Sequence, residues 1–261
     1  MPCRYEESNG TAVLTLDRPD VLNAFDEDLG KETLAAVTRA SEDASVRCIV
    51  ITGAGRAFSS GEDLGALQAD YESGHAPPLG NTLVNRYNPL IRAVRGAPKP
   101  VVAAINGVAA GAGASLALAC DFRIASEKAK LVLAFVKVGL VPDSGALWFL
   151  THMVGAARAW RLAATGDPLG AAEALALGIL DRVVAPEDFE SAWRSFAGEL
   201  AAGPTRAYAL TKQLVNAATH VTLGEQLDLE VDAQSAAGAT ADHLEGVQAF
   251  LGKRRPEFKG L

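Results

Sequence analysis

The chain has 261 residues, of which 49% are hydrophobic and 21% are charged. A chain of this length and composition can bury a substantial core, which excludes a disordered chain and a small disulfide-stapled scaffold. Its formal net charge of −7 argues against a general nucleic-acid binder, because such a protein needs a basic face against the phosphates.

Short β-rich runs alternate with helical runs over the first hundred residues. Residues 11–16 alternate as a strand does, and residues 26–42 carry apolar side chains at helical spacing. Residues 46–52 form a nearly continuous apolar run, which is typical of a strand covered on both faces. The polar residues 68–78 contain Gly and Pro and are predicted to form a mobile loop, and residues 81–94 are predicted to form a helix.

The same pattern continues through the middle of the chain. We predict a buried strand at 101–105, a helix at 113–119, short strands at 122–125 and 130–133, and mostly helices from residue 146 onward. Two strands followed by a helix, recurring at roughly 40–50 residues, predict an α/β core of stacked units rather than one hairpin sheet.

The C-terminal tail carries two amphipathic helix signals. Thr222 and Glu225 match a capping box, and Leu227 and Val231 follow at four-residue spacing. A second amphipathic stretch covers 242–251. Such helices pack either on their own core or on a neighbouring chain, and the sequence leaves both open.

Cysteine and histidine positions give no metal or disulfide pattern. The three cysteines are far apart, and Cys48 and Cys120 lie in apolar runs, so we expect both in the core. The four histidines lack ligand spacing and are expected at the surface. The P-loop, HExxH and GxSxG motifs are also absent, which argues against nucleotide hydrolysis, zinc chemistry and an α/β-hydrolase triad.

The N-terminal segment has no apolar core of a signal peptide, and no stretch reaches the roughly 20 apolar residues of a membrane span. We therefore expect a cytoplasmic protein that contacts neither nucleic acid nor membrane.

Two glycine-rich segments, 58–64 and 109–115, are predicted to be strand-to-helix turns. Small residues let a ligand approach the backbone, and N–H groups at a helix start point outward unpaired. Two such turns that face each other could aim two N–H donors at one oxygen and form an oxyanion hole. From composition alone, two ordinary tight turns explain the same residues.

Asp143 follows an apolar run and precedes a predicted helix. Low dielectric around this carboxyl would raise its pKa and suit proton transfer. An aspartate or serine before a helix is also an ordinary N-cap, so both interpretations stay open.

The order of these motifs resembles the enoyl-CoA hydratase/isomerase (crotonase) superfamily over essentially the whole chain. The matching segments are 22–24, 51–53, 57–64, 99–101, 106–113, 120–121 and 172–181. The resemblance implies an α/β fold with a spiral of ββα units and an acyl-CoA site in residues 1–200, followed by a helical oligomerisation region in residues 201–261. It also implies an acyl-CoA thioester substrate, no separate cofactor, no metal, and a homotrimer or dimer of trimers.

The resemblance further implies the residues of the site. The backbone N–H groups of Glu62 and Ala112 are expected to hold the thioester oxygen. Further contacts with the acyl group and coenzyme A are expected from Ala24, Ser60, Gly61, Asp63, Leu64, Gly111 and Phe135, and, from an adjoining subunit, from Phe250 and Lys253. The basic cluster that begins at Lys253 can equally be a solvated chain end.

The sequence departs from the hydratases of this superfamily at two positions. Ser115 and Phe135 stand where those enzymes carry their two glutamates, which argues against hydratase activity. Segments 134–145, 203–212 and 249–258 are similar to the PaaG-type isomerases of phenylacetate degradation, in which the aspartate matching Asp143 is the acid–base residue. These enzymes rearrange 2-(1,2-epoxy-1,2-dihydrophenyl)acetyl-CoA to an oxepin-CoA and shift a 3,4 double bond to 2,3.

Two alternatives remain at this stage. One is a generic Δ3,Δ2-enoyl-CoA isomerase of fatty-acid oxidation, with the same base and a different acyl pocket. The other is a non-catalytic scaffold subunit that binds CoA esters and has no need for a carboxylate beside the acyl pocket.

Overall fold

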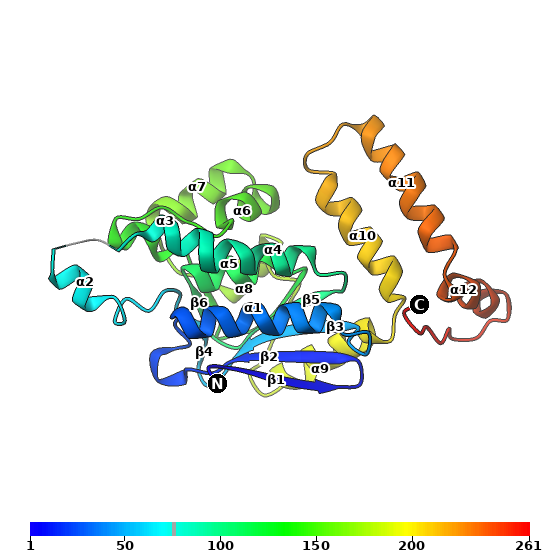
Figure 1. The fold of residues 1–261 in the computed structure, drawn as a ribbon, viewed down its shortest axis with the longest axis horizontal. Coiled ribbons are helices and arrows are strands. Elements are labelled where there is room, and N and C mark those ends of the chain that lie inside the picture. The colour runs from blue at the N-terminus through cyan, green and yellow to red at the C-terminus, as the bar shows by residue number, and fades with distance from the viewer. Residues whose placement is uncertain (75–76) are drawn as a thin grey trace.

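The computed structural model describes residues 1–74 and 77–261, which form two β-sheets, the helices that cover them, and a helical C-terminal extension (Figure 1). The larger sheet has the order β1 (Cys3–Ser8), β2 (Thr11–Leu16), β3 (Cys48–Gly53), β5 (Val101–Ile105), β7 (Phe122–Ser126) and β10 (Arg182–Val184). The smaller sheet has the order β4 (Ala57–Ser59), β6 (Val108–Ala110), β8 (Lys130–Val132) and β9 (Leu169–Gly170). Pairing is parallel from β2 to β10 and from β4 to β8, whereas β1 and β9 pair antiparallel with β2 and β8.

The helices connect and cover these strands. They are α1 (Glu27–Glu42), α2 (Gln68–Glu72), α3 (Leu79–Thr82), α4 (Asn88–Gly96), α5 (Ala112–Ala119), α6 (Ala146–Val154), α7 (Ala156–Thr165), α8 (Ala171–Ala176), α9 (Phe189–Ala201), α10 (Thr205–Ala217), α11 (Leu223–Gly238) and α12 (Ala241–Leu251). Short 3₁₀ turns cover η1 (Pro19–Val21) and η3 (Ala134–Val138), and a π-helical turn covers η2 (Leu83–Tyr87).

Successive strands alternate between the two sheets. β3, β5 and β7 join the larger sheet, and the strands that follow them directly, β4, β6 and β8, join the smaller one. Each pair is followed by helix before the next pair begins. The chain therefore forms a spiral of ββα units, which confirms the predicted α/β architecture.

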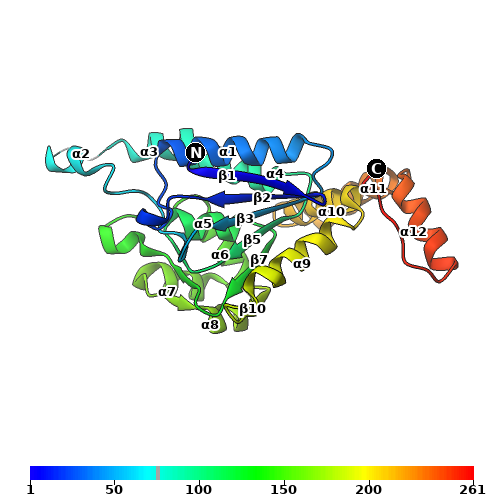
Figure 2. The same ribbon diagram turned by 90° about the horizontal axis from the view of Figure 1, so that it is seen from below.

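The larger sheet is covered on both faces (Figure 2). Ile49 and Ile51 belong to the core that includes side chains of α1, α4 and α5, whereas Val50 packs in a second core with Trp193 of α9. Because neighbouring strand residues point to opposite faces, a run that is apolar at every position fits a sheet sandwiched between helices. The prediction for this run is confirmed.

Buried cysteines also match the prediction. Cys48 and Cys120 are buried and free, and burial raises the pKa of each thiol to about 12. Both thiols are therefore neutral core side chains.

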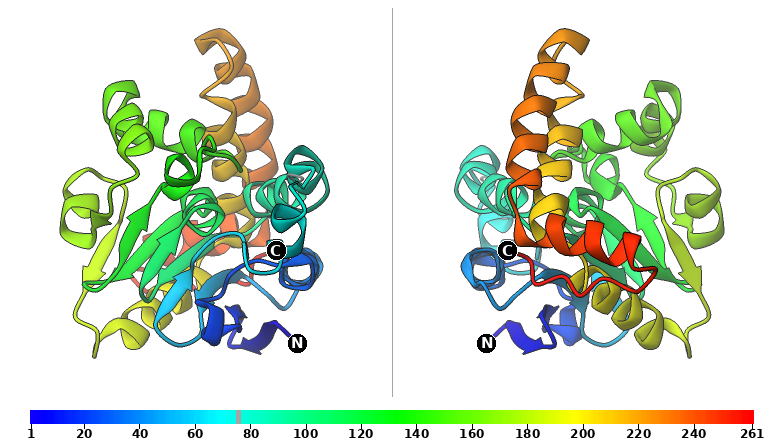
Figure 3. Two further views of the ribbon diagram at one scale, coloured as in Figure 1. Left: turned by 90° about the vertical axis from the view of Figure 1, so that its left-hand side faces the viewer. Right: turned by 90° about the vertical axis from the view of Figure 1, so that its right-hand side faces the viewer.

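The C-terminal extension leaves the core after α9. Helices α10 and α11 stand beside the core and α12 turns back across the end of the molecule (Figure 3). Arg47 anchors this region: its guanidinium donates to Thr205 Oγ1 at 3.0 Å, to the Phe258 carbonyl at 2.9 Å and to the Gly203 carbonyl. The capping box of Thr222 and Glu225 is present at the start of α11.

Two local predictions differ from the structure. The segment predicted as a loop at 68–78 contains α2 and is followed by α3, while residues 75 and 76 lie outside the described residues. The loop signals, Gly74 and the prolines, are confined to the end of that segment, and a Gln68–Glu72 side-chain hydrogen bond of 2.5 Å supports the helical turn before them. The helix predicted at 81–94 extends from Leu79 to Gly96 and widens to a π-turn just before Pro89, which has no N–H to donate.

None of the helices in the two described ranges has both the length and the apolar character to cross a membrane.

Candidate functional site

The two glycine-rich turns lie against each other at the ends of β4 and β6. Gly61 has φ +92°, and a Cβ built on it would lie 2.9 Å from the Ala110 carbonyl oxygen and 3.2 Å from the Ala112 nitrogen. A Cβ on Gly113 would lie 2.6 Å from the Ser59 carbonyl oxygen. The backbones touch where side chains would keep them apart, so both glycines are required by the close approach.

Each turn presents an unpaired backbone N–H. Ala112 is the first residue of α5, where N–H groups have no intrahelical acceptor. Among the described residues, neither the Ala112 N–H nor the Glu62 N–H donates a hydrogen bond. An oxyanion hole needs two donors that converge on one oxygen, and these two N–H groups are the candidates for that role.

The first turn was wrongly predicted to lead directly into a helix. After β4 the chain pairs with Phe25 instead: Phe25 N–H donates to the Gly61 carbonyl at 2.7 Å, and Asp63 N–H donates to the Phe25 carbonyl at 3.0 Å. This bridge holds the Glu62 peptide extended, and α2 begins only at Gln68.

A pocket of about 260 Å³ opens beside the two turns. Most of its wall is apolar. It is lined by Ser60, Glu62, Leu64, Tyr71, Leu79, Thr82, Leu83, Tyr87, Gly111, Ala112, Ala134, Phe135, Val138, Leu140, Val141 and Asp143. The structure thus brings together seven residues predicted for the site: Ser60, Glu62, Leu64, Gly111, Ala112, Phe135 and Asp143.

The other predicted residues do not line this pocket. Ala24 is buried, and the Asp63 carboxylate pairs with Arg18 at 2.9 Å. Gly61 packs closely against the second glycine-rich turn. Phe250 and Lys253 lie on the C-terminal extension, at the opposite end of the molecule from α2 and α3 (Figure 1), so this chain does not bring them to its own pocket.

Asp143 does not cap α6, so the N-cap interpretation is wrong. The N-cap is Gly145, and no side chain caps this helix. Ser144 has φ +53° and Gly145 φ +80°, so two successive residues are left-handed directly after Asp143. The buried Ser144 hydroxyl donates to Asp143 Oδ1 at 2.8 Å, and the Ser115 hydroxyl on α5 donates to the Asp143 carbonyl at 3.1 Å.

The surroundings of Asp143 favour its protonated form. Burial among apolar side chains raises the pKa of its carboxyl, the Ser144 hydroxyl partly offsets this, and the negative charge of Glu62 raises the pKa further. A carboxyl with a raised pKa in an apolar pocket is suited to accept and return a proton.

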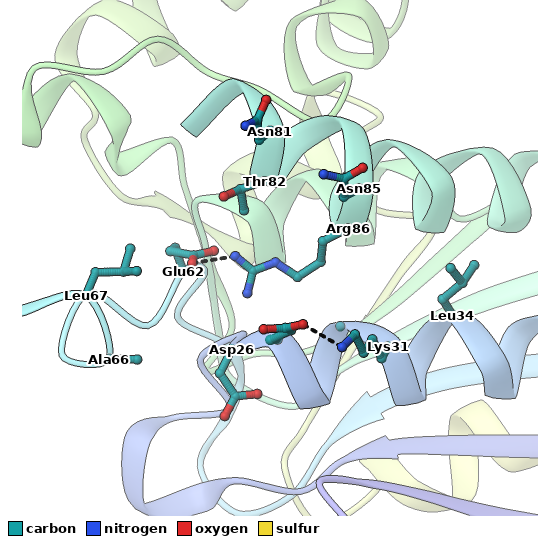
Figure 4. A pocket seen from close by; sticks show the side chains of 12 residues that line it. Asp26, Lys31, Leu34, Glu62, Ala66, Leu67, Asn81, Thr82, Asn85 and Arg86 are labelled. Atoms are coloured by element: carbon teal, nitrogen blue, oxygen red, sulfur yellow. Dashed lines mark hydrogen bonds and ion pairs between the residues drawn. The ribbon is translucent and has the colours of Figure 1, made fainter. Parts of the chain in front are cut away.

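Two residues of the site, Arg86 and Tyr87, are not predicted by the sequence motifs. The Arg86 guanidinium pairs with Glu62 Oε1 at 2.6 Å, and the Tyr87 hydroxyl donates to Glu62 Oε2. Figure 4 shows Arg86 reaching from its helix to Glu62. The signal that could have found them is Pro89, since a proline inside a helical pattern disturbs the turn before it and π-turns are frequent at functional sites.

The described residues contain no group of three His, Cys, Asp or Glu side chains placed to hold a metal ion.

Comparisons with known proteins place these features in context. The family model described as "Enoyl-CoA hydratase/isomerase" matches residues 6–261. The 1,2-epoxyphenylacetyl-CoA isomerase of Escherichia coli is 45% identical over 251 residues, which cover 96% of this chain and 95% of that protein. A Rhodobacter capsulatus protein named "Probable enoyl-CoA hydratase" is 46% identical over 257 residues, which cover 98% and 97%. The crystal structure of enoyl-CoA hydratase from Bacillus anthracis superposes with a TM-score of 0.93 at 32% identity and covers all of both chains.

Proposed function

Because the chain belongs to the enoyl-CoA hydratase/isomerase family, we propose that it isomerises acyl-CoA thioesters with one carboxylate base and two backbone N–H donors. The observation that carries the proposal is the composition of the pocket. Asp143 and Glu62 are the carboxyl groups that line it within the described residues, and both oxygens of Glu62 already accept hydrogen bonds. Asp143 accepts a hydrogen bond on Oδ1 alone within the described residues, so we assign the proton exchange with a ligand to its carboxyl.

The two N–H groups activate the substrate. We propose that Glu62 N–H and Ala112 N–H bind the thioester oxygen, which acidifies the α-carbon. When a proton leaves that carbon, negative charge develops on the oxygen, and donors already in place stabilise it without reorganisation. The contact of Gly61 with Ala112 supports a shared target for both donors.

Asp143 then acts twice on one face of the substrate. Its carboxylate takes the α-proton, the electron pair moves into the enolate, and the 3,4 π electrons are positioned to accept a proton at the γ-carbon. Asp143 returns the proton there, so the double bond moves from 3,4 to 2,3 with no net gain or loss of atoms. No cofactor beyond the CoA of the substrate takes part in this sequence.

Hydration would need a second group to hold and activate water. Ser115 and Phe135 occupy the positions where the hydratases of the family carry glutamates, and the Ser115 hydroxyl already donates to the Asp143 carbonyl. Relatives are named both as isomerases and as hydratases. The absence of glutamate at positions 115 and 135 favours isomerisation.

For the acyl group we propose 2-(1,2-epoxy-1,2-dihydrophenyl)acetyl-CoA of phenylacetate degradation. The similarity to the Escherichia coli isomerase supports this substrate. The aromatic and aliphatic walls around Phe135 and Leu140 also suit a ring.

The CoA moiety is proposed to pass along the backbone around Ser60 and Leu64. Its phosphates are proposed to meet Lys253 and its adenine Phe250, both from a neighbouring subunit of a homotrimer or a dimer of trimers. Phe250 is 82% exposed in the single chain and therefore available to a neighbour.

The test follows hydrogen exchange and isomerisation of a 3-enoyl-CoA in D₂O by NMR, comparing wild type with Asp143→Asn. Asparagine keeps the shape and can still accept from Ser144, so folding and CoA-ester binding are expected to persist. Exchange and isomerisation are expected to fall by about 10²- to 10⁴-fold, which is what a positioned acid–base group typically contributes. Asp167→Asn, a change at a surface carboxylate, serves as the control.

Normal turnover by Asp143→Asn would contradict the proposed mechanism. Binding without turnover by the wild type, for both aromatic and aliphatic acyl-CoA, would support the scaffold alternative instead. A wild-type preference for aliphatic 3-enoyl-CoA over the ring epoxide would favour the generic isomerase.

A further inference from the structure

The Glu62 side chain lies between two cavities. It lines the pocket that contains Asp143 and, on its other side, a more polar pocket of about 510 Å³ that also includes Arg86 (Figure 4). Arg86 and Tyr87 each bond one of its oxygens from the π-turn η2. The carboxylate therefore forms part of the wall that separates the two spaces.

This arrangement engages both oxygens of the Glu62 carboxylate with protein donors. A guanidinium is always charged and binds carboxylates strongly, and the tyrosine hydroxyl satisfies the second oxygen. Asp143, by contrast, accepts a hydrogen bond on Oδ1 alone within the described residues. The two carboxyl groups of the pocket therefore differ in how the protein holds them.

Helix α1 leaves space for the Arg86 side chain at Gly30. A Cβ on Gly30 would lie 2.4 Å from Arg86 Cδ and 2.5 Å from Arg86 Cγ. Glycine inside a helix costs about 1 kcal/mol relative to alanine. Here it lets the Arg86 side chain cross α1 on its way to Glu62.

Glu62 carries both the bonded side chain and one of the two N–H groups that are proposed to hold the thioester oxygen. Phe25 fixes the backbone on either side of Glu62, and Arg86 and Tyr87 fix the side chain. The position of the Glu62 peptide is thus set by contacts from two different segments, Phe25 and the π-turn η2.

We propose that Glu62 is a positioning residue, whose carboxylate anchors the peptide that carries the donor N–H and places a negative charge in the pocket that holds Asp143. This inference rests on the proposed isomerase function. Within the described ranges, the other titratable side chains that line this pocket are those of Tyr71 and Tyr87, and Arg86 is ion-paired with Glu62.

Two substitutions separate the two roles. Glu62→Gln keeps the length and a hydrogen-bond acceptor and removes the charge. Asp143 must be ionised to act as a base, so activity falls as pH drops through its pKa. Removing a neighbouring negative charge lowers that pKa, and the acidic limb of the kcat/KM profile is expected to move to lower pH.

Glu62→Ala removes the anchor as well. Loss of alignment of one donor is expected to lower kcat by on the order of tenfold to a hundredfold, with a smaller effect on KM. Glu27→Gln is the matched control. Glu27 is an ion-paired glutamate that lines the 510 Å³ pocket and does not line the pocket that contains Asp143. Its profile is expected to match wild type, and thermal melts verify that all variants fold.

An unmoved acidic limb in Glu62→Gln, or an unchanged kcat in Glu62→Ala, would overturn this inference. Asp143→Asn, measured in parallel, distinguishes failure of the positioning role from failure of the proposed function. If it is inactive while the Glu62 variants behave as wild type, only the positioning role fails. If it is active, the proposed function itself fails.

Discussion

At the scale of single residues, the site contains two features that lower the stability of the fold. A half-buried carboxyl faces apolar side chains at Asp143, and Ser144 next to it adopts a left-handed conformation. Such conformations cost of order 1–3 kcal/mol in non-glycine residues and persist where the surroundings determine them. Both features aim one carboxyl into the pocket.

Asp143→Asn is therefore expected to stabilise the fold at neutral pH. The carboxyl has a higher pKa folded than unfolded, so the folded state binds its proton more tightly and loses stability relative to the unfolded state as pH rises through the folded pKa. Asparagine has no charge to bury. The gain is expected to be about 1 kcal/mol, or roughly 2–4 °C in Tm, and to shrink as pH is lowered towards 4.

Thermal unfolding of wild type and variant across a pH series measures this difference. A variant that is less stable than wild type at neutral pH would show that the Asp143 carboxylate contributes to the fold, contrary to the desolvation argument.

At the scale of elements, the site depends on two turns held in backbone contact. β4 and β6 pair in the smaller sheet, which sets the turns that follow them side by side. Gly61 then allows an approach that any Cβ would block. The donor geometry is thus a property of strand pairing and of one glycine.

Gly61→Ala is expected to lower activity by about 10²-fold or more, because the new Cβ pushes the two donor-bearing turns apart. Gly178→Ala is the matched control. Gly178 has φ +74° and nothing within 4 Å of a built Cβ, so alanine at this position introduces a similar backbone strain without a clash. Gly178→Ala is expected to lose about 1 kcal/mol of stability from the positive φ alone, Gly61→Ala to lose more because of the added clash, and only Gly61→Ala to lose activity.

Kinetic assays with thermal melts compare the pair. Equal activity losses in the two variants would mean that general destabilisation, rather than separation of the turns, explains the effect.

At the scale of the whole molecule, the C-terminal extension exposes apolar side chains. Helix α11 buries none of its residues in the single chain, and Leu227 and Val231 are 53% and 64% exposed. Exposed apolar faces of this kind usually mark an interaction surface. We propose that they pack against neighbouring subunits, the second of the two alternatives that the sequence leaves open.

If this face holds the proposed oligomer together, replacing both Leu227 and Val231 with glutamate is expected to yield a monomer in light scattering. The acyl-CoA KM is expected to rise at the same time, because Phe250 and Lys253 of a neighbour would no longer reach the pocket. Asp228→Asn on the same helix is the control. A variant that keeps the wild-type mass would exclude this face from the subunit contact.

Several features of the protein follow from its sequence alone. The run at β3 is apolar at every position, so a strand buried on both faces is the arrangement that removes all its side chains from water. The Thr222–Glu225 capping box is likewise a local hydrogen-bond pattern that needs nothing beyond the first turn of its own helix. The family motifs also identify Glu62, Ala112 and Asp143 as candidates.

Only the tertiary structure decided how these pieces meet. Whether the two glycine turns touch depends on the pairing of β4 with β6, which is a long-range property that local patterns do not encode. Asp143 has the sequence signature of a cap, but with a left-handed backbone at Ser144 the N-cap position falls on Gly145, and the Asp143 carboxyl does not cap the helix. The contact of Arg86 and Tyr87 with Glu62 arises from the packing of a π-turn against a distant loop, because side-chain partners across a pocket are chosen by the assembled fold rather than by their neighbours in sequence.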